Sequence, residues 1–140
     1  MKKILIIEDN KDLQDIYRHS FEKDGYIVVT KDNGQDGFDV IATDLPDVIL
    51  LDLMMPGVNG FEFLQKLKGI EGVSIPVIVC SNISDIEMIT KAIQGGAAAV
   101  LLKVDYVGKQ LVDKVNYLVE EFHNKNKGLQ NEDNSTVTKQ

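Results

Sequence analysis

Five short apolar runs recur along the chain, and each is followed by a segment whose apolar residues have helical spacing. The runs are residues 4–7, 27–29, 48–51, 77–80 and 99–102. Because they are short and mostly lack polar alternation, they are typical of strands buried on both faces of a sheet. Between and after them, apolar side chains recur every three or four residues, as one face of a helix requires, in residues 13–21, 38–41, 61–67, 86–93 and 111–122.

This alternation predicts an α/β fold with a doubly wound, five-stranded parallel sheet and five helices. Crossovers between parallel strands of one sheet are right-handed, and helices then cover both of its faces. Residues that favour turns stand at the predicted junctions, namely Gly25, Pro46, Pro76, Gly95 and Gly96. Pattern and turn residues therefore indicate the same arrangement.

The composition changes near the end of the chain. From Asn124 onward the residues are mainly Asn, Lys, Gln, Ser, Thr and Asp, with hardly an apolar side chain. Such a segment buries too little apolar surface to offset the entropy lost on ordering. We therefore predict one domain over residues 1–123 and a polar, disordered tail or linker stub over residues 124–140.

Charge and composition limit the classes of partner. The 140 residues carry a formal net charge of -7, which repels nucleic acid phosphates and anionic membrane surfaces. Neither direct nucleic acid binding nor membrane insertion is expected, since no segment has the length and apolar character of a membrane span. The single cysteine, Cys80, lies in an apolar run and has no partner for an internal disulfide, which favours a reducing, cytoplasmic location.

Polar residues directly follow four of the five predicted strands: Glu8 and Asp9, Asp52, Ser81, and Lys103. Open parallel sheets bind ligands beyond the carboxyl ends of their strands, so the topology is expected to gather these side chains at one edge. Each has a simpler possible role, as a helix cap, a turn residue or a solvated charge. Their coincidence at one edge favours a single functional site.

Three carboxylates brought together repel one another, and a cation is the usual compensation. Mg2+ fits such a site, because it prefers oxygen ligands and keeps several of its waters. Beside such a cation, Asp52 could act as a nucleophile toward a phosphoryl group and become an acyl phosphate. The Ser81 hydroxyl and the Lys103 ammonium would then neutralise phosphoryl oxygens.

Together with the stretch LDLMMPG at residues 51–57 and with Gly60, these residues resemble a response-regulator receiver domain of two-component signalling, similar to the chemotaxis receivers. The resemblance covers about residues 1–123 and implies a flavodoxin-like strand order 2-1-3-4-5. It also implies that a sensor histidine kinase or a histidine phosphotransfer protein phosphorylates Asp52. The metal ligands implied for Mg2+ are Glu8, Asp9, Asp52 and the backbone carbonyl of Met54.

The output that the resemblance implies is a switch in protein–protein interactions. Ser81 reports the phosphoryl group to the last two helix–strand units, and a downstream target protein or domain binds the fourth helix, fifth strand and fifth helix. Such a chain is not an enzyme that turns over a separate substrate. It catalyses only its own phosphorylation and dephosphorylation.

Three positions depart from the family pattern. Val104 stands where a proline usually follows the lysine through a cis bond, so either the bond is trans with Lys103 re-aimed, or a strained cis bond is retained. Val100 stands where the family has an aromatic switch residue, and Asn82 where a small residue is common. These departures leave open a second hypothesis, a constitutive pseudo-receiver that binds partners without cycling through phosphorylation.

Two apolar residues, Met54 and Ile83, occupy positions that influence in this family how readily water attacks the acyl phosphate. Because neither can orient a water molecule, we expect slow loss of the phosphoryl group.

Two other functions that occur on folds of similar topology fit this sequence less well. An aspartyl-phosphate phosphatase would have a second Asp where Met54 stands. A flavin-binding protein would have a phosphate-cradling loop where Glu8 and Asp9 place negative charge.

Overall fold

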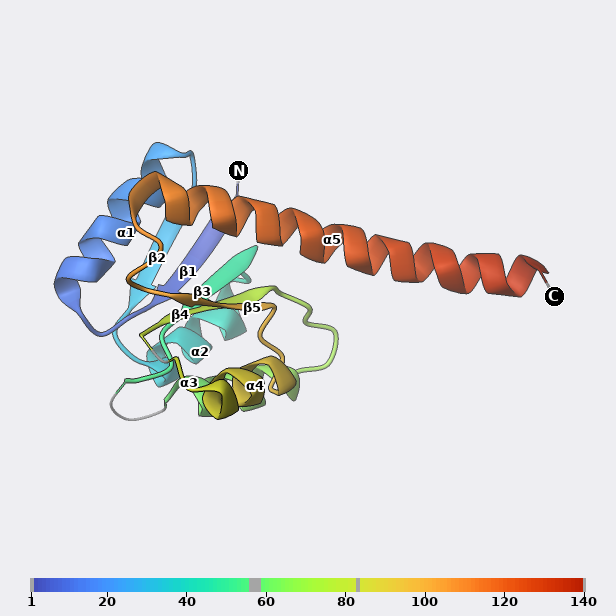
Figure 1. Ribbon diagram of the computed structural model, residues 1–140, viewed down its shortest axis with the longest axis horizontal. Helices are drawn as coiled ribbons and strands as arrows, with labels where there is room; N and C mark the ends of the chain where they lie inside the picture. The colour runs from blue at the N-terminus through green and yellow to red at the C-terminus, as the bar shows by residue number, and fades with distance from the viewer. Residues whose placement is uncertain (1, 56–58, 83, 140) are drawn as a thin grey trace.

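The computed structural model describes residues 2–55, 59–82 and 84–139, and it describes side chains as far as Lys127. The strands are β1 (Lys3–Ile7), β2 (Ile27–Lys31), β3 (Val48–Leu51), β4 (Val77–Ser81) and β5 (Ala99–Leu102). The helices are α1 (Lys11–Lys23), α2 (Gly34–Thr43), α3 (Gly60–Lys68), α4 (Ile86–Gln94) and α5 (Gly108–Lys139). All strand pairs are parallel, in the order β2-β1-β3-β4-β5 (Figure 1). The predicted fold class and strand order are confirmed.

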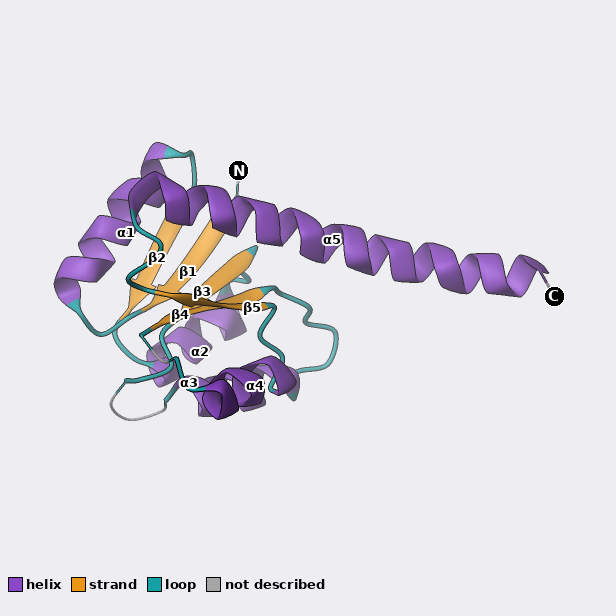
Figure 2. Cartoon of the chain, in the orientation of Figure 1, coloured by secondary structure: helices purple, strands orange, loops and turns teal. Residues whose placement is uncertain are grey.

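Helices cover both faces of the sheet, with α1 and α5 on one face and α2, α3 and α4 on the other (Figure 2). The side chains of β1 alternate between the two layers. Ile4 and Ile6 join the core beneath α1 and α5, whereas Leu5 and Ile7 join the core beneath the other three helices. Because both faces are buried, the strands contain continuous apolar runs.

Four helices begin at an asparagine or aspartate cap. The side chains of Asn10, Asn33, Asn59 and Asp85 each accept a hydrogen bond from a backbone amide in the first turn of α1, α2, α3 and α4. These caps satisfy amides that have no partner within the helix. Since Asn10 caps α1 and Asp85 caps α4, the neighbouring Asp9 and Ser81 are not needed for capping.

Helix α5 runs from Gly108 to Lys139 and extends far beyond the sheet (Figure 1). Here the structure differs from the disordered tail predicted from Asn124, because the backbone continues as helix to Lys139. Extending an existing helix needs no new nucleus, which is the costly step of helix formation. The domain boundary after residue 123 stays a prediction. Although α5 is long, no helix in the described part of the chain combines the length and apolar character needed to cross a membrane.

Candidate functional site

The carboxyl ends of β1, β3, β4 and β5 meet at one edge of the sheet. Ile7 pairs with Leu51 and Leu51 with Val79, so the residues after β1 and β3 are neighbours. A depression of about 570 Å³ lies at this edge. It is lined by Glu8, Asp9, Asn10, Leu13, Asp52, Met54, Ser81, Asn82 and Lys103. The five side chains that follow the strands therefore lie together.

The three acids form a compact cluster. Glu8, Asp9 and Asp52 each present a carboxylate oxygen within 4.8 Å of the other two. Glu8 and Asp52 are buried, while Asp9 is exposed. The backbones of Glu8 and Asp52 continue the hydrogen bonding of the sheet. The Glu8 amide donates to the Lys31 carbonyl and the Asp52 amide to the Ile7 carbonyl, both at 3.0 Å. The cluster thus combines fixed carboxylates with one side open to solvent.

Lys103 supplies positive charge to this cluster. Its Nζ lies 2.6 Å from Glu8 Oε1 and 3.1 Å from Asp52 Oδ2. The described residues contain no cis peptide bond, so the Lys103-Val104 bond is trans. Of the two alternatives that the sequence leaves open, the trans bond is therefore present, and the lysine still reaches both acids.

Burial and charge act on these groups in opposite directions. Burial holds the pKa of Glu8 above its ordinary value, although the nearby Lys103 ammonium and a hydrogen bond from the Asn10 amide oppose this effect. Burial alone would lower the pKa of Lys103, but its contacts with Glu8 and Asp52 outweigh burial and raise the pKa. Lys103 is accordingly an ammonium at neutral pH.

Glu8 Oε1 fits a cation ligand. This oxygen is buried, and among the described residues its close contact is the ion pair with Lys103, which lacks the angle of a well-directed hydrogen bond. A buried carboxylate oxygen without a directed donor is costly unless a charge compensates it. With the other two carboxylates nearby, the donor set has the oxygen chemistry that Mg2+ prefers.

The remaining predicted residues lie around the acids. The Met54 amide donates to Asp52 Oδ1 at 3.2 Å, and its side chain is 61% exposed. Ser81 ends β4 and is buried, whereas Asn82 is exposed at the rim. Val100 is half-buried against the core beneath α4. Ile83 lies outside the described residues.

Sequence reasoning missed one residue near the acids. Gln14 is buried on the inner side of α1, and its Nε2 donates a hydrogen bond to the Glu8 carbonyl. The signal that could have identified it is helical register, since Gln14 is three and seven residues before the buried Tyr17 and Phe21. Ile16, expected on the buried side of this helix, is instead 49% exposed.

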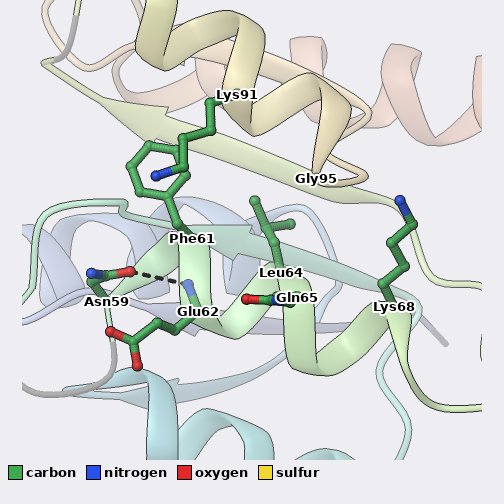
Figure 3. A pocket seen from close by; sticks show the side chains of 8 residues that line it. All are labelled: Asn59, Phe61, Glu62, Leu64, Gln65, Lys68, Lys91 and Gly95. Atoms are coloured by element: carbon green, nitrogen blue, oxygen red, sulfur yellow. Dashed lines mark hydrogen bonds between the residues drawn. The ribbon is translucent and has the colours of Figure 1, made fainter.

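A second depression lies between α3 and α4 (Figure 3), and its lining does not include Glu8, Asp9 or Asp52. Phe61 and Leu64 contribute apolar surface, and Lys91 Nζ lies 4.5 Å from the centroid of the Phe61 ring. Asn59 caps α3 there by accepting from the Glu62 amide (Figure 3). Among the described residues, the group of three possible metal ligands lies at the carboxyl edge and not in this depression.

Comparison with characterised proteins gives one family. A sequence profile described as the response regulator receiver domain matches residues 4–116. Sporulation initiation phosphotransferase F of Bacillus subtilis (strain 168) is 32% identical over 96 residues, covering 69% of this chain and 77% of that protein. Response regulator MprA of Mycobacterium tuberculosis is 31% identical over 95 residues, covering 68% of this chain and 41% of MprA. Response regulator SaeR of Staphylococcus epidermidis is 37% identical over 78 residues, covering 56% of this chain and 33% of SaeR.

The match thus spans less than half the length of MprA and SaeR. Among solved structures, the receiver domain of a signal transduction histidine kinase from Syntrophus aciditrophicus has a TM-score of 0.78 at 27% identity, covering 86% of this chain and 92% of that one. The receiver domain of the Francisella response regulator 1452 has a TM-score of 0.78 at 26% identity, covering 86% of this chain and 98% of that one. Sequence and fold agree, and the chain belongs to the response regulator receiver domain family.

Proposed function

We propose that this chain accepts a phosphoryl group on Asp52 and thereby switches its binding to other proteins. The observation that carries the proposal is the setting of the Asp52 carboxylate. It is buried at the carboxyl edge, within 4.8 Å of oxygens of Glu8 and Asp9 and 3.1 Å from the Lys103 ammonium. Three carboxylates beside one ammonium leave an excess of negative charge. A second cation would offset this excess, and the Asp52 carboxylate could then react with a phosphoryl group.

Mg2+ is the proposed second cation. Glu8, Asp9 and Asp52 would hold it, together with the backbone carbonyl of Met54, and the exposed side chain of Asp9 leaves a path from solvent. When bound, the ion supplies positive charge that offsets the charges of the carboxylates and of phosphoryl oxygens. Among the described residues, Glu8 Oε1 has no well-directed hydrogen-bond donor, and this supports the assignment.

The proposed reaction is an in-line transfer to Asp52. A carboxylate oxygen attacks the phosphorus of a phosphohistidine on the donor, and an oxygen–phosphorus bond forms as the nitrogen–phosphorus bond breaks. The electron pair of the broken bond stays on the imidazole nitrogen, which takes a proton from solvent. Lys103 and the Ser81 hydroxyl donate hydrogen bonds to phosphoryl oxygens, so negative charge at the product is compensated.

The partners follow from the chemistry and from the relatives. A histidine kinase or a histidine phosphotransfer protein would donate the phosphoryl group, as the name of the similar phosphotransferase F supports. A downstream protein or domain would bind the switched state, since other relatives are named response regulators. We place the exchange in the cytoplasm, which the free, buried thiol of Cys80 favours. The chain would catalyse only its own phosphorylation and dephosphorylation.

Mass spectrometry of the intact protein after incubation with acetyl phosphate and Mg2+ tests this function. We expect one phosphoryl adduct in the native chain, and none with Asp52→Asn or without Mg2+. Asp39→Asn is the matched control, because this exposed aspartate on α2 does not line the depression that holds the acids, and it is expected to keep the adduct. Absence of an adduct in the native chain, with no binding of beryllofluoride, would support a constitutive binding module instead.

A further inference from the structure

Gln14 is a polar side chain inside the core beneath α1. It is 5% exposed and stands in helical register with Tyr17 and Phe21. Burial of a primary amide is unfavourable unless hydrogen bonds replace those lost to water. The partners of this amide therefore indicate why a polar residue stands at this position.

The amide of Gln14 joins three segments of the chain. The two N–H groups of Nε2 are shared among three acceptors, which are the carbonyl of Glu8, Asp32 Oδ1 at 2.7 Å and, at the longer distance of 3.3 Å, the carbonyl of Lys31. Two of these acceptors, Lys31 and Asp32, are the last residue of β2 and the first residue after it. The third acceptor is the first residue after β1. One helix side chain thus holds the ends of two neighbouring strands.

The outer end of this connection is held by charge. Lys11 Nζ lies 2.6 Å from Asp32 Oδ1, the oxygen that also accepts from Gln14. Hydrogen bonds from Lys11 and then from Gln14 hold the pKa of Asp32 below its ordinary value, so its carboxylate is charged at neutral pH. The buried amide therefore lies between a fixed carbonyl and a charged, anchored acceptor.

We propose that Gln14 is a positioning residue for the acidic turn Glu8–Asp9, and this inference rests on the proposed function. Gln14 does not line the depression that holds the acids, so it acts through the backbone of Glu8. With that carbonyl held and the Glu8 amide bonded to Lys31, the carboxylates of both acids face Asp52 before any ion binds. Partners of this kind commonly change metal affinity about 10- to 100-fold when they are removed.

The test replaces Gln14 and measures Mg2+ affinity by calorimetric titration. Gln14→Met keeps the length and helix propensity but removes the donors, and we expect the dissociation constant to rise about tenfold. Gln14→Arg restores N–H donors toward the same three oxygens and is expected to recover most of the affinity. Gln35→Met is the matched control, because it removes the same amide from an exposed position on α2.

Two further readouts distinguish positioning from a general loss of stability. In Gln14→Met, the phosphorylation rate by acetyl phosphate should need more Mg2+ but reach the native maximum at saturation. Without Mg2+, hydrogen exchange of the Glu8 amide, bonded to Lys31, should be faster. If Gln14→Met does not fold, Asp32→Ala removes one acceptor at the surface and should also speed this exchange.

The outcomes separate this inference from the function on which it rests. Failure of the native chain to bind Mg2+ contradicts the proposed function. Native binding with the same affinity and the same Glu8 exchange in Gln14→Met and Gln35→Met overturns the positioning role alone. An equal loss of affinity in both methionine variants overturns it as well, since the effect would not depend on the contacts of Gln14.

Discussion

Helices α1 and α4 border the site from opposite faces of the sheet, and they are held very differently. Helix α1 buries Tyr17 and Phe21, and polar contacts add to this packing. Arg18 on the same helix donates to the Val28 carbonyl at 3.2 Å and to Thr30 Oγ1 at 2.7 Å. Apolar packing therefore holds α1 on the sheet, and the contacts of Arg18 add polar anchors to β2, the strand that follows it.

Helix α4 has fewer anchors. Ala92 is its only residue that is fully buried, while Ile86 is 80% exposed and Ile93 is 46% exposed. A helix that buries little apolar surface contributes little to global stability and opens locally at low free energy. Helix α1, which follows the acidic turn, is thus held by more contacts than α4, the helix that follows Ser81. This difference suits a site whose proposed output passes through Ser81.

Truncation of a core side chain should give the largest difference in stability between changes in α1 and changes in α4. The Phe21 ring is fully buried and packs edge-to-face on Tyr26, with centroids 5.2 Å apart. We expect Phe21→Ala to lower the free energy of unfolding by about 3–5 kcal/mol. Ile86→Ala on α4 should change it by about 0.5 kcal/mol or less. Urea denaturation measures both, and losses of similar size would contradict the contrast between the two helices.

Alkaline pH should give the next effect on stability, and Tyr26 on the α1 side should contribute to it. Burial, followed by the charges of Asp24 and Asp47, raises the pKa of Tyr26 to about 12. The folded state then keeps a proton that the unfolded chain loses near pH 10, so stability falls as pH rises from about 10 to 12. A shift of two pKa units corresponds to about 2–3 kcal/mol.

Tyr26→Phe is expected to reduce this alkaline loss, because the variant has no phenol to ionise. Thermal unfolding between pH 9 and pH 12 is the measurement. Tyr117→Phe serves as the control, since Tyr117 is exposed and its removal should leave the alkaline loss of the native chain intact. Identical pH profiles for Tyr26→Phe and the native chain would show that Tyr26 does not couple protonation to folding.

Much of this arrangement follows from the sequence. Strands buried on both faces appear as apolar runs, and parallel strands bring the residues after each run to one edge, so Glu8, Asp52 and Lys103 were predictable neighbours. Gln14 was not, because one polar residue on an apolar helix face identifies no partner until β2 is placed beside β1. The exposure of Ile16 was missed because the spacing of apolar residues alone does not establish which of them face the sheet.

Other features depend on contacts that no local pattern encodes. The sequence left open the isomer of the Lys103-Val104 bond, and the contacts of the lysine with Glu8 and Asp52 occur with a trans bond. The helical backbone beyond Asn124 depends on continuation from the packed part of α5, whereas the composition of the segment alone predicts disorder. The trans bond is the ordinary preference of a non-proline peptide, whereas the helical continuation depends on the residues of α5 that precede the segment.

The smallest effect tests the comparison most directly, because it removes the same kind of interaction from each helix. Asn10 caps α1 by accepting from the Leu13 amide at 3.1 Å, and Asp85 caps α4 by accepting from the Glu87 amide at 2.8 Å. Loss of a cap costs the helix about 1 kcal/mol. We expect Asn10→Ala to show that full loss in global urea denaturation, because α1 unfolds only with the core.

Asp85→Ala should show less than half of that loss globally, since α4 opens without the rest of the domain. Its cost should appear instead as faster hydrogen exchange of the α4 amides, with exchange in α1 unchanged. The two measurements together separate a weak cap from a weakly anchored helix. Equal global losses for the two variants would mean that α4 unfolds with the core, and the inferred difference in anchoring between α1 and α4 would be wrong.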